Sequence, residues 1–429
     1  MQFSKWVTLG FGALCLMAVA GVLNAQHLYY MSAILLTLPG VSYALGWYAL
    51  RGLKFTRELP SSAWEGEEGA IVYAAENPTP IARYFLTVRE PLPVWIAPLE
   101  EEPPLFNAPA QETTRVAHRV SFLKRGVYDV EHFDVTAMDP LGVFAFTKRI
   151  HGEGELVVYP LPQPLQPLAL SGAERYGWQE FTRMVLRGSS VDPDGVREYA
   201  PGDPLRRIHW RQTARTGKLS VIEFEEAQAI NLVIALDLKR GTEVGQGRDT
   251  TLEYGVRLTA SLAQLAVQQS ASLRLLLPSD LERDGKRAPS LAAVGQAGRG
   301  TAQLYAILDA LARVQAESAR PASATVIETG GSLLPGTTLL VITSHPDMDL
   351  PLALARYAVT GANVAVVYID PETFAGGRGR VSDAQRQRFF AELLSARVRP
   401  FVLRYNDQGD LTPEAVVHAE PRSSDHAYA

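Results

Sequence analysis

Two long uncharged runs near the N-terminus most constrain what this chain can fold into. Residues 6–23 carry no charge and are mostly apolar, and residues 28–50 form a second such run that only a Pro-Gly pair interrupts. Each run is close to the roughly 20 residues that a helix needs to cross the hydrocarbon layer of a membrane. Because residues 24–27 leave room only for a tight turn, the sequence predicts a transmembrane helical hairpin over residues 1–52.

Basic residues around these runs predict the orientation of the hairpin. Lys5 precedes the first run and Arg51, Lys54 and Arg57 follow the second, whereas the connection carries no Lys or Arg. Since basic residues favour the cytoplasmic side, we expect both termini and the soluble domains in the cytoplasm. A signal peptide cleaved after Ala25 is the alternative; it would leave the second run as an anchor and invert the orientation.

The composition of the 429 residues is that of a folded protein with two or three domains. The net charge of -5 gives no general attraction to nucleic acid or to an anionic membrane. The one cysteine, Cys15, lies in the first apolar run, which excludes an intrachain disulfide framework and a cysteine metal cluster. Lipid attachment at Cys15 is a weak alternative, because Leu14 stands where a small residue is expected.

Residues 53–160 are expected to form an all-β domain. Short apolar runs alternate there with proline, glycine and acidic turns, a spacing typical of an immunoglobulin-like sandwich. Within one run, Val116, Val120 and Phe122 share a face, as a half-buried strand requires. Nothing in this domain indicates catalysis, so we expect a spacer or docking surface. The expected strands cover residues 69–76, 81–90, 114–123, 126–136, 142–150 and 154–159.

Residues 231–417 are expected to form an α/β domain. Four apolar runs, typical of buried parallel strands, alternate with helical patterns, which predicts a doubly wound, Rossmann-like sheet. The glycine-rich residues 374–381 are predicted to be a mobile loop, and residues 418–429 a disordered tail. The clearest helical face carries Leu304, Ile307, Leu308, Leu311 and Val314. The expected strands cover residues 232–236, 273–277, 338–342 and 364–369.

The segment between these domains, residues 161–230, holds the most specific motif in the chain. Within residues 197–215 a Pro-Gly-Asp turn precedes a short predicted helix, which Asp203 can cap. We expect Ile208 and Trp210 to pack against the α/β domain. Arginine side chains supply fork-shaped donors suited to carboxylates or phosphates. Those of the motif are Arg197, Arg206, Arg207, Arg211 and Arg215.

This motif resembles the signature of the bacterial family called domain of unknown function 58. The family pattern of short charged and aromatic groups is matched by Arg197-Glu198-Tyr199, Gly202-Asp203, Arg206-Arg207-Ile208-His209-Trp210, Ala214-Arg215, Lys218-Leu219, Glu223 and Glu225. Two further matches lie in the expected sandwich, at Arg125-Gly126-Val127-Tyr128 and Asp139-Pro140-Leu141-Gly142. The resemblance spans nearly the whole chain.

The resemblance implies a location and a type of partner. Family members are similar to membrane partners of MoxR-type AAA+ ATPases, accompany transglutaminase-like membrane proteins, and are suspected of helping protein assembly or maturation at the envelope. We therefore expect a non-enzymatic adaptor of the bacterial inner membrane, without a cofactor. The alternative to partner docking stays open: the charged residues of the motif form internal salt bridges and have a purely structural role. The predicted docking residues are Arg197, Glu198, Tyr199, Gly202, Asp203, Arg206, Arg207, His209, Trp210 and Arg215.

The resemblance also implies a C-terminal domain similar to von Willebrand A, in which an Asp-x-Ser-x-Ser motif and a threonine hold a metal ion. The matching positions here are Asp237, Lys239, Gly241 and Thr343. A lysine ammonium has no lone pair and repels a divalent cation, so we expect this site to be degenerate and to bind no metal. The sequence also lacks the phosphate-loop, zinc-protease and hydrolase-elbow motifs.

Two other functions stay open. Residues 183–218 carry eight Lys or Arg against four Asp or Glu, which suits a phosphate, a lipid headgroup or nucleic acid; the thin aromatic content makes stacking on single strands a poor fit. A hydrolase that uses His209, Asp203 and Glu198 ranks last, and requires that these side chains converge in an open cleft. The sequence does not specify the oligomeric state.

Overall fold

The computed structural model describes residues 2–60, 62–139, 142, 144–163, 165, 180–182, 184–185, 193–200, 208–224, 230–281, 294–331, 333–405, 411 and 414–415. The chain divides into two compact units, Met1–Tyr159 and Pro160–Ala429. The finer domain boundaries that the sequence suggests, after residues 52, 160, 230 and 417, stay predictions.

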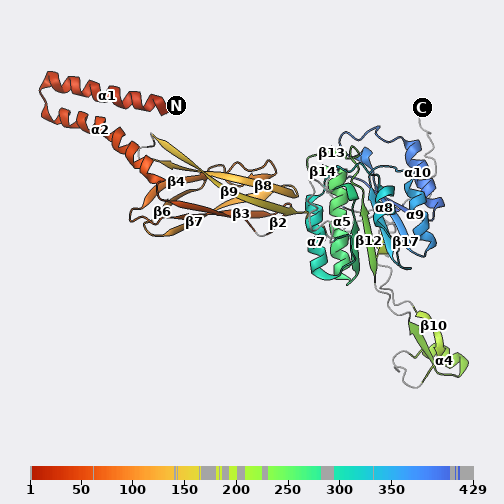
Figure 1. Ribbon diagram of the computed structural model, residues 1–429. Helices are drawn as coiled ribbons and strands as arrows, with labels where there is room; N and C mark the ends of the chain where they lie inside the picture. The colour runs from red at the N-terminus through yellow and green to blue at the C-terminus, as the bar shows by residue number, and fades with distance from the viewer. Residues whose placement is uncertain are drawn as a thin grey trace, which may run out of the picture. The chain divides into compact units, whose positions relative to one another are not determined.

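The first unit begins with two helices that lie side by side, α1 (Gln2–Leu23) and α2 (Gln26–Ala49) (Figure 1). The turn between them is tight, with Asn24 in the left-handed region at φ 46°. The hydroxyl of Ser32 in α2 donates to the carbonyl oxygen of Ala13 in α1 at 2.9 Å. Among the described residues, α2 is the helix long and apolar enough to cross a membrane, and α1 adds the shorter apolar stretch Gly10–Leu23. One candidate membrane helix near the N-terminus is thus observed.

Two sheets with a shared core follow the helices. Every strand pair in them is antiparallel except β2 with β9. One sheet has the order β1 (Lys54–Glu58), β3 (Glu68–Glu76), β7 (Thr113–Phe122), β5 (Ile96–Pro98). The other has the order β2 (Ala63–Trp64), β9 (Ala145–Tyr159), β8 (Gly126–Met138), β4 (Arg83–Arg89), β6 (Leu105–Ala108).

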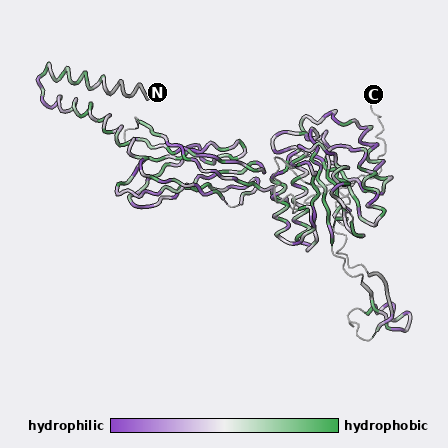
Figure 2. The backbone as a smooth tube through the Cα atoms, in the orientation of Figure 1, coloured by the Kyte–Doolittle hydropathy of each residue, from purple (hydrophilic) through white to green (hydrophobic). Residues whose placement is uncertain are grey.

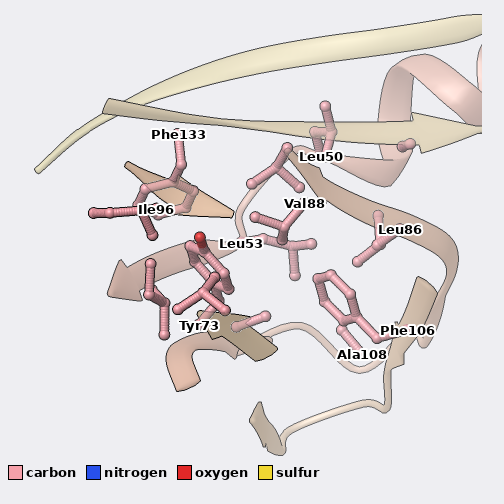
Figure 3. Close-up of a cluster of buried hydrophobic side chains, with 14 of the residues drawn as sticks. Leu50, Leu53, Tyr73, Leu86, Val88, Ile96, Phe106, Ala108 and Phe133 are labelled. Atoms are coloured by element: carbon pink, nitrogen blue, oxygen red, sulfur yellow. The ribbon is translucent and has the colours of Figure 1, made fainter. Parts of the chain in front are cut away.

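The core between these sheets follows from alternation along each strand. In β7 the even-numbered residues point inward, so that Val120 and Phe122 are buried, as the sequence predicts. Tyr73 of β3 and Val88 of β4 meet in the same cluster, which Figure 3 shows together with Ile96 and Phe133. The all-β character predicted for residues 53–160 is therefore observed.

Strand β9 corrects one prediction, because its 15 residues replace two separate strands. The sequence predicts a break at the glycines near its middle. Instead Gly154 pairs with Val130 of β8, and a Cβ at Gly154 would stand 2.7 Å from Cδ1 of Leu59. The Arg57 guanidinium also donates to the carbonyl oxygens of Gly152 and Val130, beside a bulge in β9 where residues 152 and 153 stand opposite residue 131 of β8. Gly154 makes room for Leu59, and neither glycine ends the strand.

The last turns of α2 pack directly on the end of the β8–β9 hairpin. The Ser42 hydroxyl donates to the buried carboxylate of Asp139, whose Oδ1 also accepts from the Phe144 backbone N–H at 2.5 Å. The Tyr43 ring meets the edge of Phe146 at 5.2 Å. Asp139 begins a turn, which a hydrogen bond from the Gly142 N–H to the Asp139 carbonyl oxygen closes at 2.9 Å. Helix α2 and the β domain are thus joined through this turn.

The second unit contains a six-stranded sheet in the order β15-β12-β16-β17-β18-β19, parallel except for β19. Figure 2 shows hydrophobic residues concentrated in its central strands. The four predicted strands are confirmed, whereas β18 and β19 were missed; β18 contains a proline and an arginine in five residues. The strands are β12 (Asn231–Leu236), β15 (Ser272–Leu276), β16 (Thr338–Thr343), β17 (Asn363–Ile369), β18 (Arg399–Leu403) and β19 (Glu414–Ala415).

Helices cover both faces of this sheet (Figure 1). One face carries α5 (Thr251–Gln268) and α7 (Gly300–Arg313). The other carries α8 (Ala322–Thr329), α9 (Leu350–Val359) and α10 (Asp383–Ser395). In α7 the predicted face is confirmed, because Ile307, Leu308 and Leu311 are buried.

The glycine-rich loop at residues 374–381 is anchored at both ends. Phe374 and Val381 are buried, and the Phe374 ring packs edge-on against Tyr254 at 5.0 Å between centroids. Short elements complete this unit: β13 (Gly245–Gln246), β14 (Asp249–Thr250), η2 (Ser279–Leu281) and η3 (Pro371–Thr373). The tail predicted for residues 418–429 lies outside the described residues.

Candidate functional site

The family-like motif folds into a small element of its own, which we call the signature element: β10 (Pro193–Glu198), α4 (Trp210–Thr216) and β11 (Ser220–Phe224). Strands β10 and β11 pair antiparallel. Ile208 bridges to Val221, and both side chains are buried. The His209 backbone N–H donates to the Ser220 carbonyl oxygen at 2.8 Å. The hairpin thereby fixes the point at which α4 starts.

Both ends of α4 are capped. The Nδ1 atom of His209 accepts a hydrogen bond from the Gln212 backbone N–H at 3.0 Å, which places a lone pair on Nδ1 and, in the neutral ring, the proton on Nε2. At the other end Gly217 adopts φ 70° and its N–H donates to the Thr213 carbonyl oxygen at 2.9 Å. Sequence reasoning missed this role of His209. Asp203, for which it predicted capping, lies outside the described residues.

The outer surface of α4 carries an aromatic ring and cations. Trp210 is 67% exposed, so the prediction that it packs against the α/β domain is wrong. Ile208 is buried, and its bridge is to Val221 of β11. Arg211 and Arg215, four residues apart on one face, are exposed. No residue of this seven-residue helix is buried. Packing therefore contributes little to the stability of α4, and the caps and the hairpin hold it.

Six of the predicted docking residues lie in the signature element or directly beside its strands and helix: Arg197, Glu198, Tyr199, His209, Trp210 and Arg215. Glu198 pairs with Lys218 at 2.6 Å, and this hydrogen bond raises the pKa of Lys218. The Tyr199 backbone N–H donates to the Leu219 carbonyl oxygen at 2.8 Å. The backbone of Arg197 pairs with Val221 in the hairpin. Four other predicted residues, Gly202, Asp203, Arg206 and Arg207, lie outside the described residues.

A second polar cluster forms where β12 and β16 end. Because these neighbouring strands are parallel, their carboxyl ends meet at one edge of the sheet. The Thr343 hydroxyl donates to Oδ2 of Asp237 at 2.7 Å, and the Lys239 backbone N–H donates to Oδ1 at 3.1 Å. Burial raises the pKa of Asp237. Burial also lowers the pKa of the nearby His345.

The residues at this edge do not fit a divalent cation. Gly241 has φ +80°, a left-handed conformation that disfavours the serine a metal motif would place there. The carboxylate of Asp347 accepts backbone N–H bonds from Ser323 and Asp349 at 2.8 and 3.2 Å. The cavity beside Asp237, of about 10 Å³, has room for one water molecule. Lysine at position 239 supplies no lone pair.

Comparison with known proteins identifies the family to which this architecture is similar. Residues 195–373 match the model of the family described as "Protein of unknown function DUF58". The DUF58 match begins in β10 and continues through β17. It therefore contains the described residues of the signature element from residue 195 onward, and the polar cluster at the ends of β12 and β16. The predicted resemblance is confirmed over these residues.

A relative of the same kind occurs in Bacillus subtilis (strain 168), where it is named "Uncharacterized protein YeaD". The two sequences are 23% identical over 249 residues, which are 56% of this chain and 59% of the relative. The chain thus spans somewhat over half the length of that DUF58 relative.

Similarity to solved structures is slight. A Salmonella alpha-2-macroglobulin mutant has 16% identity and a TM-score of 0.20 over 25% of this chain and 7% of that one. A FixG-related protein from Vibrio parahaemolyticus has 12% identity and a TM-score of 0.17 over 25% of this chain and 94% of that one. Scores this low carry no argument about fold or function.

Proposed function

We propose that this protein is a membrane-anchored, non-enzymatic adaptor whose signature element binds a partner protein. The observation that carries the proposal is the exposed Trp210 beside Arg211 and Arg215. Tryptophan and arginine dominate the binding energy of protein interfaces, where a buried aromatic ring fills a pocket of the partner. Before such an interface forms, the aromatic ring must be exposed and held in place, and Trp210 on the short, capped helix α4 meets both conditions.

The geometry gives little support to catalysis in the same element. His209 uses Nδ1 to cap α4, and the carboxylate of Glu198 pairs with Lys218. The hydrolase alternative needs both groups, with Asp203, around one open cleft. At the sheet edge, Asp237 and Asp347 are engaged in hydrogen bonds beside a cavity the size of one water molecule. Binding without turnover is the simpler function for these residues.

The family resemblance supplies the partner class in this proposal, a MoxR-type AAA+ ATPase, with a transglutaminase-like membrane protein as a second associate in protein assembly or maturation at the envelope. We place α1 and α2 across the inner membrane with both ends in the cytoplasm, as the basic residues after α2 favour. In this proposal the first unit is an immunoglobulin-like sandwich. The parallel sheet is Rossmann-like and similar to von Willebrand A; the helices on both of its faces support that assignment.

The experiment is an affinity purification of the full chain from native membranes in mild detergent. Wild type is compared with Trp210→Ala, with Arg211→Ala, and with the control Arg388→Ala, an exposed arginine on α10. The proposal expects a AAA+ ATPase with wild type and control and its loss with Trp210→Ala. Equal recovery from all four proteins would exclude the signature element as the docking site.

The exposed cations favour one second candidate, the binding of an anionic ligand through Arg211, Arg215 and Lys218. Lys218 is already paired with Glu198, and both side chains are 69% exposed, so this pair adds little to affinity. Binding of labelled single-stranded RNA or anionic vesicles that falls steeply with salt would support this candidate. Partner binding that depends on Trp210 and changes little with salt would support the adaptor.

A further inference from the structure

The first unit contains a hollow that the proposed function does not use. Its volume is about 460 Å³, within the range of roughly 300–1,000 Å³ typical of ligand sites. It opens between β4, the segment that connects β4 to β5, and the inward face of β7. Val88 and Ile96 line it and belong at the same time to the buried core (Figure 3). The hollow therefore reaches from the surface to the space between the two sheets.

Apolar side chains form most of its wall. Leu92, Pro93 and Val94 come from the segment that precedes β5, and Pro103 comes from the segment that follows it. Val94 is 86% exposed, although it is a large aliphatic residue at the mouth of the hollow. Walls made of proline and aliphatic side chains suit an aliphatic ligand group, because the transfer of apolar surface out of water is favourable.

One buried polar group in the hollow needs a partner. His118, an inward-facing residue of β7, lines the hollow and is only 7% exposed. Its Nδ1 atom is buried and has no hydrogen-bond partner among the described residues. A buried polar atom without a hydrogen bond is costly and uncommon in folded proteins. An occupant of the hollow that offers a polar group beside this ring would remove that cost.

The charges around the hollow favour a basic occupant. Glu100 and Glu101 are exposed at its rim, and Arg89 is the one basic residue among those that line it. Glu90 lies deeper, where Arg57 and Tyr73 already donate to its two carboxylate oxygens. Among the described residues, the negative charge without an ion pair is therefore at the rim, and the floor is apolar apart from Glu90 and His118.

We propose that this hollow is a docking groove for an extended peptide segment of a partner protein, in which aliphatic residues cover the apolar wall and a lysine or arginine pairs with Glu100 and Glu101. A polar group of the peptide meets His118. This groove lies in the first unit and does not depend on the signature element or on the identity of the ATPase. It would allow the protein to hold a second polypeptide, as an adaptor does.

In the test, a display library of random seven-residue peptides is passed over the full chain in detergent, and the peptides that bind are recovered. Four proteins are compared: wild type, the charge-reversal variant Glu100→Lys with Glu101→Lys, the wall variant Val94→Asp, and the control Glu102→Lys. Glu102 is exposed beside the same two glutamates but does not line the hollow. All these substitutions are at exposed positions, so folding is preserved.

If the hollow is a peptide-docking groove, the wild-type protein and the Glu102→Lys control should both enrich peptides that combine a basic residue with aliphatic residues. Chosen peptides should bind at least about tenfold more weakly to the charge-reversal and wall variants. His118→Ala should weaken the same peptides; because this side chain is buried, the unfolding temperature of the variant is measured beside its peptide affinity. Failure to enrich any peptide, enrichment of acidic peptides by wild type, or equal binding to the charge-reversal variant would each overturn the proposal.

Discussion

The hydroxyl of Thr343 donates a 2.7 Å hydrogen bond to Oδ2 of Asp237 and so joins the ends of two neighbouring parallel strands. Burial raises the pKa of this carboxyl, and the bonds from Thr343 and the Lys239 backbone oppose that shift without cancelling it. The ionised form of Asp237 is therefore less favourable in the folded chain than in water. Stability of the second unit should depend on pH through this residue.

The first prediction concerns the sign of that dependence. Because the pKa of Asp237 is higher in the folded state than its usual 3.8, the folded chain holds the proton more tightly. Its contribution to the free energy of unfolding is full below about pH 4 and is lost as pH rises through the raised pKa. Asp237→Asn should remove this decline. Unfolding midpoints between pH 4 and 8 check it, with Asp309→Asn on α7 as the control; parallel curves for wild type and Asp237→Asn would contradict it.

The second prediction concerns divalent cations. With Lys239 beside Asp237 and Gly241 in a left-handed conformation, millimolar Mg²⁺ should leave the unfolding temperature unchanged. A cation present at a hundred times its dissociation constant would stabilise the folded state by about 2.7 kcal/mol. Calorimetry with and without Mg²⁺ is the measurement. A rise in unfolding temperature that Asp237→Asn abolishes would show that the site binds metal after all.

The third prediction concerns a buried ion pair in the first unit. Arg57 and Glu90 pair with both side chains buried, and the Tyr73 hydroxyl donates to the same carboxylate. Burial raises the pKa of Tyr73, which keeps its hydroxyl a donor. Arg57→Met leaves Glu90 without its cation and should cost about 3–5 kcal/mol of unfolding free energy.

Arg115→Ala is the matched control for that loss, because Arg115 pairs with Glu58 in an exposed position. Its removal should cost no more than about 1 kcal/mol. Denaturant titrations of both variants give the comparison. Similar losses in the two variants would mean that the buried pair contributes nothing special to the fold.

The fourth prediction concerns the joint between helix α2 and the β8–β9 hairpin. A Cβ at Gly46 would stand 2.7 Å from the Phe146 ring, whereas a Cβ at Gly40 meets nothing within 4 Å. Gly46→Ala should therefore loosen the joint and lower the unfolding temperature of the first unit. Gly40→Ala should be neutral or stabilising, since alanine favours helix by about 0.5–1 kcal/mol over glycine. Limited proteolysis near Asp139 offers a second readout, and equal cleavage of both variants would count against a packed joint.

Much of the architecture follows from hydrophobic periodicity. Continuous apolar runs mark β12, β15, β16 and β17 because a strand buried on both faces must be apolar throughout. The same logic fails for β18, where Pro400 and Arg399 interrupt the pattern at an outer position of the sheet. It also fails for β9, where Gly154 reflects the close approach of Leu59, a contact between distant parts of the chain.

The candidate site was predictable in its residues but not in its geometry. Arginines and a tryptophan at close spacing indicate a binding element, yet spacing alone does not show which side chain faces water. The sequence predicts that Trp210 packs against the α/β domain together with Ile208, two residues away. The structure separates them, because Ile208 bridges to β11 while Trp210 begins α4 and points outward. The hollow beside His118 gives no sequence signal, since its walls come from residues 88–103 and from His118 of β7, which is distant in the sequence.

The most direct test of the adaptor measures the dissociation constant between the purified full chain, in a lipid nanodisc, and the AAA+ ATPase recovered from the same membranes. Trp210→Ala should raise the constant roughly thirtyfold, the effect of a hot-spot loss of about 2 kcal/mol. Arg388→Ala should leave it unchanged. If wild type and Trp210→Ala bind the ATPase with equal affinity, or if wild type does not bind it, the signature element is not the docking site and the central claim fails.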